Sequence, residues 1–288
     1  MILITGASGR VARRTAELLA RNGNRLRLMT RSPQRAPKLP EAEILRGDFA
    51  EPETLKRAFE GVGTALVVSA SGKPGERALL HRNAFQAAAL AGVSHIVYLS
   101  LQGAAPDSKY PFSRDHYLSE QYLFASGLPC TVLRNSFYMD MFLEKFDVGG
   151  VVRGPAGQGR GAFVSRADVA RMAAAALQKP PGGIHEVTGP EAVSVADIAG
   201  RLSAIAGRQL RYEDEPAEAA RERLSRLEPL AWRVDLSIGW FDAIAAGELS
   251  GTSDAILRFT GASPLSLEEY FSAFPELLLS IAAGPPVA

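Results

Sequence analysis

Short apolar runs alternate with helical patterns from the second residue onwards, and this alternation restricts the folds open to the chain. Apolar runs of strand length occupy residues 2–5, 25–30, 42–45, 64–69, 95–100 and 130–134. Between them, apolar positions at helical spacing predict helices over 10–22, from Pro52 onwards, over 76–91 and over about 113–126. Apolar strands in strict alternation with helices predict a parallel sheet covered on both faces. Right-handed crossovers then make a doubly wound α/β fold the economical topology.

The pattern loosens after Arg134. Six glycines and Pro155 lie between residues 149 and 161, which is too dense for a single regular element. A helix over 167–178 and a strand over 184–188 resume the sheet, and the rest is predicted to be mainly helical, over 194–206, 215–226, 229–246, 252–260 and 266–282. Gly284-Pro285-Pro286 predicts a frayed end. We therefore expect one α/β domain over 1–134, its sheet completed by about 162–188, and a smaller, mainly helical region over 135–161 and 189–288.

The composition is that of an ordinary globular chain. Of its 288 residues 47% are hydrophobic and 22% are charged, with 32 basic against 31 acidic side chains. This excludes disorder or a coiled coil over the whole chain, and the near-zero net charge gives no footprint of nucleic-acid binding. No apolar run is long enough for a membrane helix, and no charged leader precedes the first strand, so we expect a cytoplasmic protein. The single cysteine, Cys130, permits no internal disulfide, and no metal-binding motif is present.

The first predicted strand turns into the first predicted helix through a glycine-rich segment. It reads Gly6-Ala7-Ser8-Gly9-Arg10-Val11, with Ala12 where a third glycine stands in the usual dinucleotide fingerprint. Gly6 permits the tight turn, and Gly9 lets backbone N–H groups approach a pyrophosphate. The N-terminus of the helix adds unsatisfied donors and the positive end of its dipole. In this strand–turn–helix context the motif predicts a dinucleotide cofactor, against the alternative of a purely structural turn.

The end of the second strand indicates which dinucleotide. A protein that binds NAD usually has a carboxylate near this point for the ribose hydroxyls, but this chain has Arg31. A guanidinium pairs with a 2′-phosphate through two hydrogen bonds, and Arg10 is expected to add a second positive charge. Residues 1–50 hold ten basic and four acidic groups, with no carboxylate between Glu17 and Glu41. The alternative explanation of this basic charge is a helix face exposed to solvent. DNA binding is disfavoured, because these arginines lie within a buried strand–helix pattern. We predict NADP(H).

These residues, together with segments further along, resemble a known family. The segments are Gly47-Asp48-Phe49, 95–100 (HIVYLS), 133–138 (LRNSFY), 154–159 (GPAGQG) and 187–190 (VTGP). The chain resembles the NmrA-like branch of the atypical short-chain dehydrogenases/reductases, and within it the NADPH-dependent quinone oxidoreductases and triphenylmethane reductases. The resemblance covers nearly the whole chain and implies a Rossmann-type fold with NADP(H) as cofactor.

The resemblance also implies where the cofactor lies. The implied residues follow the carboxyl ends of strands, the edge at which an open α/β sheet binds its ligand. They are Asp48 and Phe49 at the adenine, Ser69, Ala70 and Ser71 along the ribose and pyrophosphate, Ser100 and Leu101 near the nicotinamide, and Asn135, Ser136 and Phe137 between nicotinamide and substrate. For Asp48 and Ser100 a purely structural role is the alternative.

The predicted helix over 113–126 lacks half of a catalytic pair. Typical short-chain reductases use Tyr-x-x-x-Lys, in which the lysine lowers the pKa of the tyrosine. Here Tyr117 is followed four residues later by Gln121, which is neutral. Two mechanisms remain open: an easily reduced acceptor needs no dedicated acid, or His116 or Tyr117 donates the proton without a lysine. We favour the first, with the protein supplying proximity and orientation. The structural alternative for His116 is a hydrogen bond to Glu120, four residues on.

Methionine and aromatic side chains after the sixth strand predict the wall of a substrate site. They are Tyr138, Met139, Met141, Phe142 and Phe163, and their alternative is a core between the two regions. The leading hypothesis is an NADPH-dependent reductase of a quinone-like or other small aromatic acceptor, acting as a monomer or homodimer. The second is a non-enzymatic NADP(H)-sensing regulator of the NmrA type, which the missing lysine supports equally. A sugar-nucleotide epimerase is disfavoured because it needs the Tyr/Lys pair.

Overall fold

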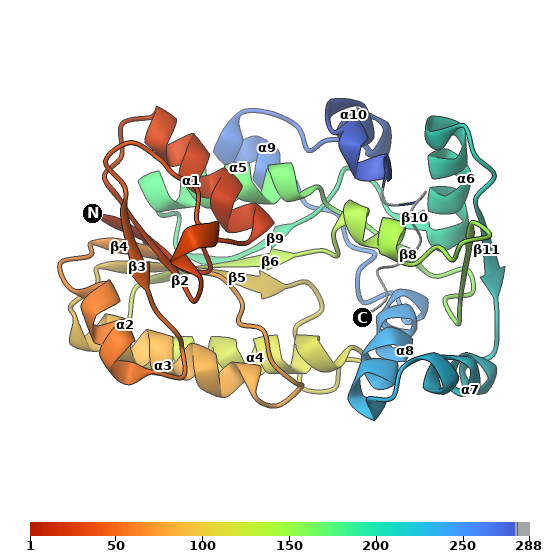
Figure 1. Ribbon diagram of the computed structural model, residues 1–288, viewed down its shortest axis with the longest axis horizontal. Helices are drawn as coiled ribbons and strands as arrows, with labels where there is room; N and C mark the ends of the chain where they lie inside the picture. Colours follow the sequence, from red (N-terminus) through yellow and green to blue (C-terminus); the bar gives the residue numbers. More distant parts are fainter. Residues whose placement is uncertain (280, 282–288) are drawn as a thin grey trace.

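This computed structural model describes residues 1–279 and 281, and in that part of the chain seven strands form one parallel sheet (Figure 1). The strand order is β3-β2-β1-β4-β5-β6-β9, so the direction of winding reverses between β1 and β4. The strands are β1 (Ile2–Ile4), β2 (Leu26–Thr30), β3 (Glu43–Arg46), β4 (Thr64–Val67), β5 (His95–Leu101), β6 (Cys130–Asn135) and β9 (Gly183–Val187). The predicted Rossmann-type, doubly wound parallel sheet is confirmed.

Helices cover both faces of this sheet. One layer consists of α1 (Arg10–Arg21), α5 (Arg166–Gln178) and α9 (Ala255–Thr260), and the other of α2 (Pro52–Phe59), α3 (Arg77–Leu90) and α4 (Pro111–Ala125) (Figure 1). Successive strand residues alternate between the layers: Leu66 packs in the first, whereas Ala65 and Val67 pack in the second. Burial on both faces explains why the strands are apolar throughout. Among the described residues, no helix combines the length and the apolar character needed to cross a membrane.

Apart from η1 (Pro33–Arg35), which follows β2, the remaining elements gather at one end of the sheet (Figure 1). They are η2 (Met139–Glu144), β7 (Val151–Gly154), β8 (Arg160–Gly161), β10 (Val193–Ser194), α6 (Val195–Ala206), β11 (Arg211–Asp214), α7 (Ala217–Leu227), α8 (Ala231–Ala245), α10 (Leu267–Ala273) and η3 (Pro275–Leu278). β7 pairs with β11, and β8 pairs with β10. The sequence pattern did not predict these two pairings, because such short strands span too few residues to show a period.

The predicted helix over 266–282 is interrupted in the middle: η3 follows α10, and the described residues Leu279 and Ile281 are helical again. α10 ends at Ala273, and the next residue, Phe274, has φ −133° and ψ 61°, outside the helical region. Pro275 follows, and a proline disfavours the helical conformation of the residue before it. Residues 280 and 282 and the predicted frayed end at 284–286 lie outside the described residues.

Gly189, just after β9, occupies a position where a side chain would meet backbone. A Cβ added there would lie too close to the carbonyl oxygen of Phe163. We therefore expect Gly189→Ala to lower the free energy of unfolding by about 1–3 kcal/mol, the usual cost of overpacking. Urea unfolding followed by circular dichroism measures the change.

Gly200→Ala is the matched control. Gly200 lies inside α6, and a Cβ there would meet nothing within 4 Å. This variant is expected to raise the free energy of unfolding by up to about 1 kcal/mol, because alanine favours a helix more than glycine does. Equal effects of the two substitutions would contradict the steric argument.

Candidate functional site

The glycine-rich turn between β1 and α1 forms a cradle of backbone groups. Gly6 has a φ of 60°, in the left-handed region that favours glycine. Gly9 is the N-cap residue of α1 and provides no side-chain cap, so N–H groups of the first turn stay open. A Cβ on Gly9 would lie only 3.2 Å from the carbonyl oxygen of Gly6. The turn therefore keeps a concave surface for an anion at the positive end of the helix dipole.

A cavity of about 400 Å³ lies beside this turn. Predicted cofactor residues that line it are Gly6, Ser8, Gly9, Arg31, Asp48, Phe49, Ser69, Ala70 and Ser71. Ser8 is held in place by the hydroxyl of Thr30, at 3.1 Å between the two oxygens. Arg31 is exposed and forms no ion pair with any carboxylate in the described part of the chain. Its guanidinium is therefore free to bind a phosphate at this end of the site.

Arg10 does not join Arg31. Its Nη1 lies 2.8 Å from Oδ2 of Asp140, and it lines a second cavity instead. The expected second positive charge beside Arg31 is therefore absent, because a distant carboxylate holds the Arg10 side chain. Asp48 lines the smaller cavity and also has the structural role that the sequence offered as the alternative. Its Oδ1 accepts a hydrogen bond from the N–H of Ala50 at 3.0 Å.

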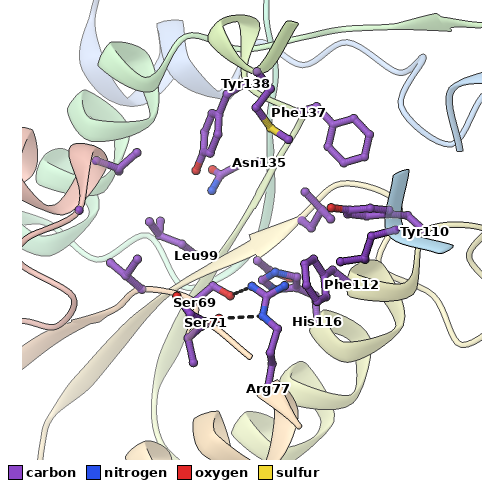
Figure 2. A pocket seen from close by; sticks show the side chains of 18 of the residues that line it. Ser69, Ser71, Arg77, Leu99, Tyr110, Phe112, His116, Asn135, Phe137 and Tyr138 are labelled. Atoms are coloured by element: carbon purple, nitrogen blue, oxygen red, sulfur yellow. Dashed lines mark hydrogen bonds between the residues drawn. The ribbon is translucent and has the colours of Figure 1, made fainter. Parts of the chain in front are cut away.

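The second cavity, of about 760 Å³, adjoins the first and shares residues 68–71 and Gly9 with it. Ser69 and Ser71 are among the labelled residues of this pocket in Figure 2. The remaining predicted cofactor residues line this larger cavity: Arg10, Val11, Ser100, Leu101, Asn135, Ser136 and Phe137. Together the two cavities bring every predicted cofactor residue to one groove. That groove follows the ends of β1, β4, β5 and β6, where a parallel α/β sheet binds its ligand.

Two buried polar atoms in the larger cavity have no hydrogen-bond partner within the described residues. They are Oδ1 of Asn135 and Oγ of Ser136, in residues that are 2% and 1% exposed. Buried polar groups are normally hydrogen bonded, so an unpartnered pair beside a cavity points to a ligand. An amide and a hydroxyl suit the carboxamide of a nicotinamide. With the cradle at Gly9 and the smaller cavity beyond it, the residues present fit a dinucleotide cofactor.

The hydroxyl of Ser100 is committed to the protein interior. It donates to Oε1 of Glu120 at 2.5 Å, and Arg134 holds both oxygens of the same carboxylate, at 2.9 and 2.6 Å. The hydrogen bond between His116 and Glu120 that helical spacing offered as an alternative is therefore absent. Ser100 borders the larger cavity, but its side chain has a structural partner.

Sequence reasoning missed a buried cation in the wall of the larger cavity, Arg77. It is 8% exposed, its Nε donates to the carbonyl of Ala70 at 2.8 Å, and its Nη2 donates to Ser69. The guanidinium lies 4.0 Å from the centre of the Phe112 ring. Burial lowers the pKa of Arg77, yet arginine stays charged at neutral pH. None of the described carboxylates forms an ion pair with it, so its positive charge is available to a ligand.

Two histidines and a tyrosine form a buried cluster next to Arg77. The hydroxyl of Tyr98 lies 2.8 Å from Nδ1 of His116 and 3.1 Å from Nδ1 of His81. Burial lowers the pKa of His81 to about 3 and holds that of His116 well below its usual value, and the charge of Arg77 lowers both further. Both imidazoles are therefore neutral at physiological pH. The cluster presents the ring of His116 to the cavity (Figure 2).

Of the two predicted catalytic residues, the structure brings His116 to the cavity and leaves Tyr117 away from it. Tyr117 lines neither cavity, because neighbouring residues of a helix point about 100° apart. Tyr110, just before α4, lines the larger cavity instead. Burial raises the pKa of Tyr110 to about 12, and its hydroxyl has no hydrogen-bond partner among the described residues. The Tyr-x-x-x-Lys pattern places the tyrosine inside the helix and therefore does not mark Tyr110, which precedes it.

Part of the predicted substrate wall belongs to the core. Tyr138 and Met141 line the larger cavity, whereas Met139, Phe142 and Phe163 are buried in the hydrophobic cluster of the C-terminal region. The ring of Phe142 lies 4.7 Å from that of Phe163 and 5.0 Å from that of Trp240. Further lining residues of this cavity come from α8 and the segment before it. They are Glu228, Trp232, Arg233, Leu236 and Ser237, which no motif in the sequence marked.

Comparison with known proteins identifies the family of this chain. Residues 6–180 match a family model described as NAD(P)H-binding. The chain belongs to this family. It is 32% identical to Quinone oxidoreductase 2 of Escherichia coli, over 74% of this chain and 77% of that protein. It is 28% identical to NAD(P)H azoreductase of Xenophilus azovorans, over 95% of this chain and 97% of that protein.

Solved structures agree with this assignment. An NADPH-dependent quinone oxidoreductase from Escherichia coli, complexed with NADPH, matches with a TM-score of 0.86 at 28% identity, covering 95% of this chain and 99% of that one. The triphenylmethane reductase of Citrobacter sp., complexed with NADP(H), matches with a TM-score of 0.83 at 25% identity, covering 95% and 100%. The chain is thus an NAD(P)H-dependent oxidoreductase of the NmrA-like atypical short-chain group, as its motifs indicated.

The buried histidines make stability depend on pH. The folded-state pKa of His81, about 3, lies below the value of about 6.5 for an unfolded chain, so unfolding between these values takes up a proton. Stability therefore falls as the pH falls through this window, by about 1.4 kcal/mol per pH unit for one proton. We expect His81→Asn to show a shallower loss of unfolding free energy than the wild type between about pH 6.5 and about pH 5 in urea titrations.

The control for this measurement is His185→Asn, at a half-buried histidine on β9 outside the cluster. It is expected to keep the wild-type slope. A His81→Asn slope equal to that of the wild type would contradict a buried, neutral His81.

Proposed function

We propose that this oxidoreductase uses NADPH to reduce a quinone-like or other small aromatic acceptor. One observation carries the proposal: a single groove joins an open phosphate cradle and the free cation Arg31 to a larger cavity whose wall contains His116 and the buried positive charge of Arg77. The names of two relatives, a quinone oxidoreductase and an azoreductase, support an acceptor of this class. These relatives do not favour the alternative of a non-enzymatic sensor.

We further propose how the chain divides this work. Residues 1–134, with 162–188 completing the sheet, would hold NADP(H), and 135–161 with 189–288 would bind the acceptor. Arg31 would bind the 2′-phosphate, the first turn of α1 the pyrophosphate, and Asn135 and Ser136 the nicotinamide carboxamide. The NADPH in the quinone oxidoreductase structure supports the choice of phosphorylated cofactor.

The chemistry requires little from the protein beyond binding and charge stabilisation. When bound, the reduced cofactor supplies a hydride, and one proton from solvent completes the two-electron reduction of a quinone to a hydroquinone. Apolar walls that include Leu99, Phe112 and Phe137 exclude water around the acceptor. The positive charge of Arg77 would stabilise the negative charge that develops on the acceptor during reduction. This scheme needs no lysine-activated tyrosine, which agrees with Gln121 in place of the lysine.

The charge of Arg77 predicts which acceptors react. A neutral quinone gains negative charge during reduction, whereas a cationic triphenylmethane dye brings positive charge into a wall that already contains an unpaired cation. We expect kcat/KM for the quinone to exceed that for the dye by about tenfold or more, measured by loss of NADPH absorbance. Tight NADPH binding without turnover of any acceptor in a panel of quinones, azo compounds and dyes would overturn the proposed function.

Arg31→Ala tests the choice of cofactor. Loss of a charge-assisted, two-point contact to the 2′-phosphate is expected to raise the Kd for NADPH by about 10–100-fold, with the Kd for NADH within about twofold of the wild type. Fluorescence titration measures both constants. Arg35→Ala is the control, because Arg35 is also exposed, lies four residues away and lines neither cavity. An equal loss of NADPH and NADH affinity in Arg31→Ala would contradict the assignment.

A further inference from the structure

The donors and acceptors of the buried cluster can be assigned one by one, starting from the backbone. The N–H of Ala70 lies 2.8 Å from Nε2 of His81. A backbone N–H can only donate, so Nε2 of His81 is the acceptor. Because His81 is neutral, its single ring hydrogen is on Nδ1. The tautomer of His81 is therefore set by a residue of the loop that lines both cavities.

The hydrogen on Nδ1 of His81 has two neighbours, Oγ of Ser119 at 2.8 Å and the hydroxyl oxygen of Tyr98 at 3.1 Å. Ser119 donates its own hydrogen to the carbonyl of Asp115 at 2.6 Å, since a carbonyl can only accept. Both hydroxyl oxygens thus act as acceptors toward His81. The hydrogen of Tyr98 cannot point at the same Nδ1.

Two groups near the Tyr98 hydroxyl could still accept that hydrogen, Oγ of Ser119 and Nδ1 of His116. Oγ of Ser119 already accepts from His81, so the hydrogen goes to Nδ1 of His116, at 2.8 Å. His116 is 5% exposed and neutral, so its own hydrogen must be on Nε2. The ring lines the larger cavity, and Nε2 has no hydrogen-bond partner among the described residues. Figure 2 shows His116 beside Arg77 at the cavity wall. His116 therefore presents the N–H of Nε2 to the cavity, and the lone pair of its Nδ1 faces Tyr98.

We propose that His116 binds the reducible oxygen of the acceptor as a hydrogen-bond donor through Nε2, and that Tyr98 and His81 are positioning residues that hold this tautomer. The inference rests on the proposed function of the cavity. It names the acceptor class as one whose reacting group ends in an oxygen that gains negative charge, as a quinone carbonyl does. His116 keeps its hydrogen throughout, so the proton that completes the reduction comes from solvent.

The surroundings of His116 favour the neutral ring. The titratable and charged groups around it are Arg77 and His81 on α3, Tyr98 on β5, Tyr110 before α4, Asp115 on α4, and Glu228 and Arg233 across the cavity. The carboxylate of Asp115 accepts from the N–H of Gly75 at 2.8 Å, and Glu228 pairs with Arg233 at 3.2 Å. None of the described carboxylates is hydrogen bonded to His116. With Arg77 nearby and no such partner, an imidazolium is disfavoured.

Long-range 1H–15N correlation spectra of protein containing 15N-histidine measure the tautomer directly, without cofactor or turnover. The signals of His116 are assigned by their absence from the spectrum of His116→Gln. We expect them to show a protonated Nε2 and an unprotonated Nδ1 from about pH 8 to about pH 5, with no titration. A protonated Nδ1, or a titration near about pH 6.5, would overturn the assignment.

Tyr98→Phe removes the hydroxyl that sets the tautomer and keeps the ring. We expect His116 in this variant to populate both tautomers, and kcat/KM for a quinone to fall about tenfold with an unchanged Kd for NADPH. Tyr122→Phe makes the same chemical change on α4, at a hydroxyl with no hydrogen-bond partner among the described residues. It is expected to change neither readout. A Tyr98→Phe protein with the wild-type tautomer would overturn the positioning role.

The donor itself is tested by a pair of substitutions at His116. We expect kcat/KM to fall about 100-fold in His116→Leu, which has no donor, and clearly less in His116→Gln, which keeps an N–H group. Equal losses in the two variants, or none in His116→Leu, would overturn the role of Nε2–H. A wild-type protein that reduces no quinone would overturn the proposed function and the contact to the acceptor together, whereas the spectra decide the tautomer independently.

Discussion

The reversal of winding between β1 and β4 determines where this protein can bind a ligand. The loops after these two neighbouring strands lead to opposite faces of the sheet, so a crevice opens between them at the carboxyl edge. Gly9 lies on one side of the crevice and residues 68–71 lie on the other, and both cavities share them. The groove that follows from this topology collects residues from many segments of the chain, and each segment contributes the residues just after a strand. The position of the site is thus a property of the strand order.

A hydrogen-bonded polar cluster lies directly behind that groove, and Ala70 connects the two. The N–H of Ala70 donates to His81, and its carbonyl accepts from Arg77, so α3 holds the loop at two backbone atoms. Burying such groups is unfavourable unless each one is paired, and the ladder of hydrogen bonds from Ala70 to His116 provides the pairing. Apolar side chains of similar volume would pack as well, but they would present neither a fixed donor nor a positive charge to a ligand. The cluster is therefore better explained by chemistry at the cavity than by stability.

Local patterns were sufficient for the fold and for many of the residues that line the smaller cavity. Strand–helix alternation, the turn from Gly6 to Gly9 and the cation Arg31 each depend on near neighbours in the chain, and periodicity or turn chemistry records such features. Arg10 marks the limit of this reasoning. The motif located its backbone correctly, but the direction of its side chain depends on Asp140, which is 130 residues away. Met139, Phe142 and Phe163 show the same limit, since an apolar residue after a strand can line a cavity or pack in a core with the same local sequence.

The sequence by itself determined the class of fold, the position of the glycine turn and the cation at the end of β2, because these follow from local conformational preference and composition. Only the tertiary structure decided which polar groups meet. Helical spacing left His116 free to pair with Glu120, but β6 brings Arg134 to that carboxylate and β5 brings Tyr98 to the imidazole. Arg77 arrives from a third element, α3. These partners are set by how helices pack on the sheet, and no local pattern in one sequence encodes that packing.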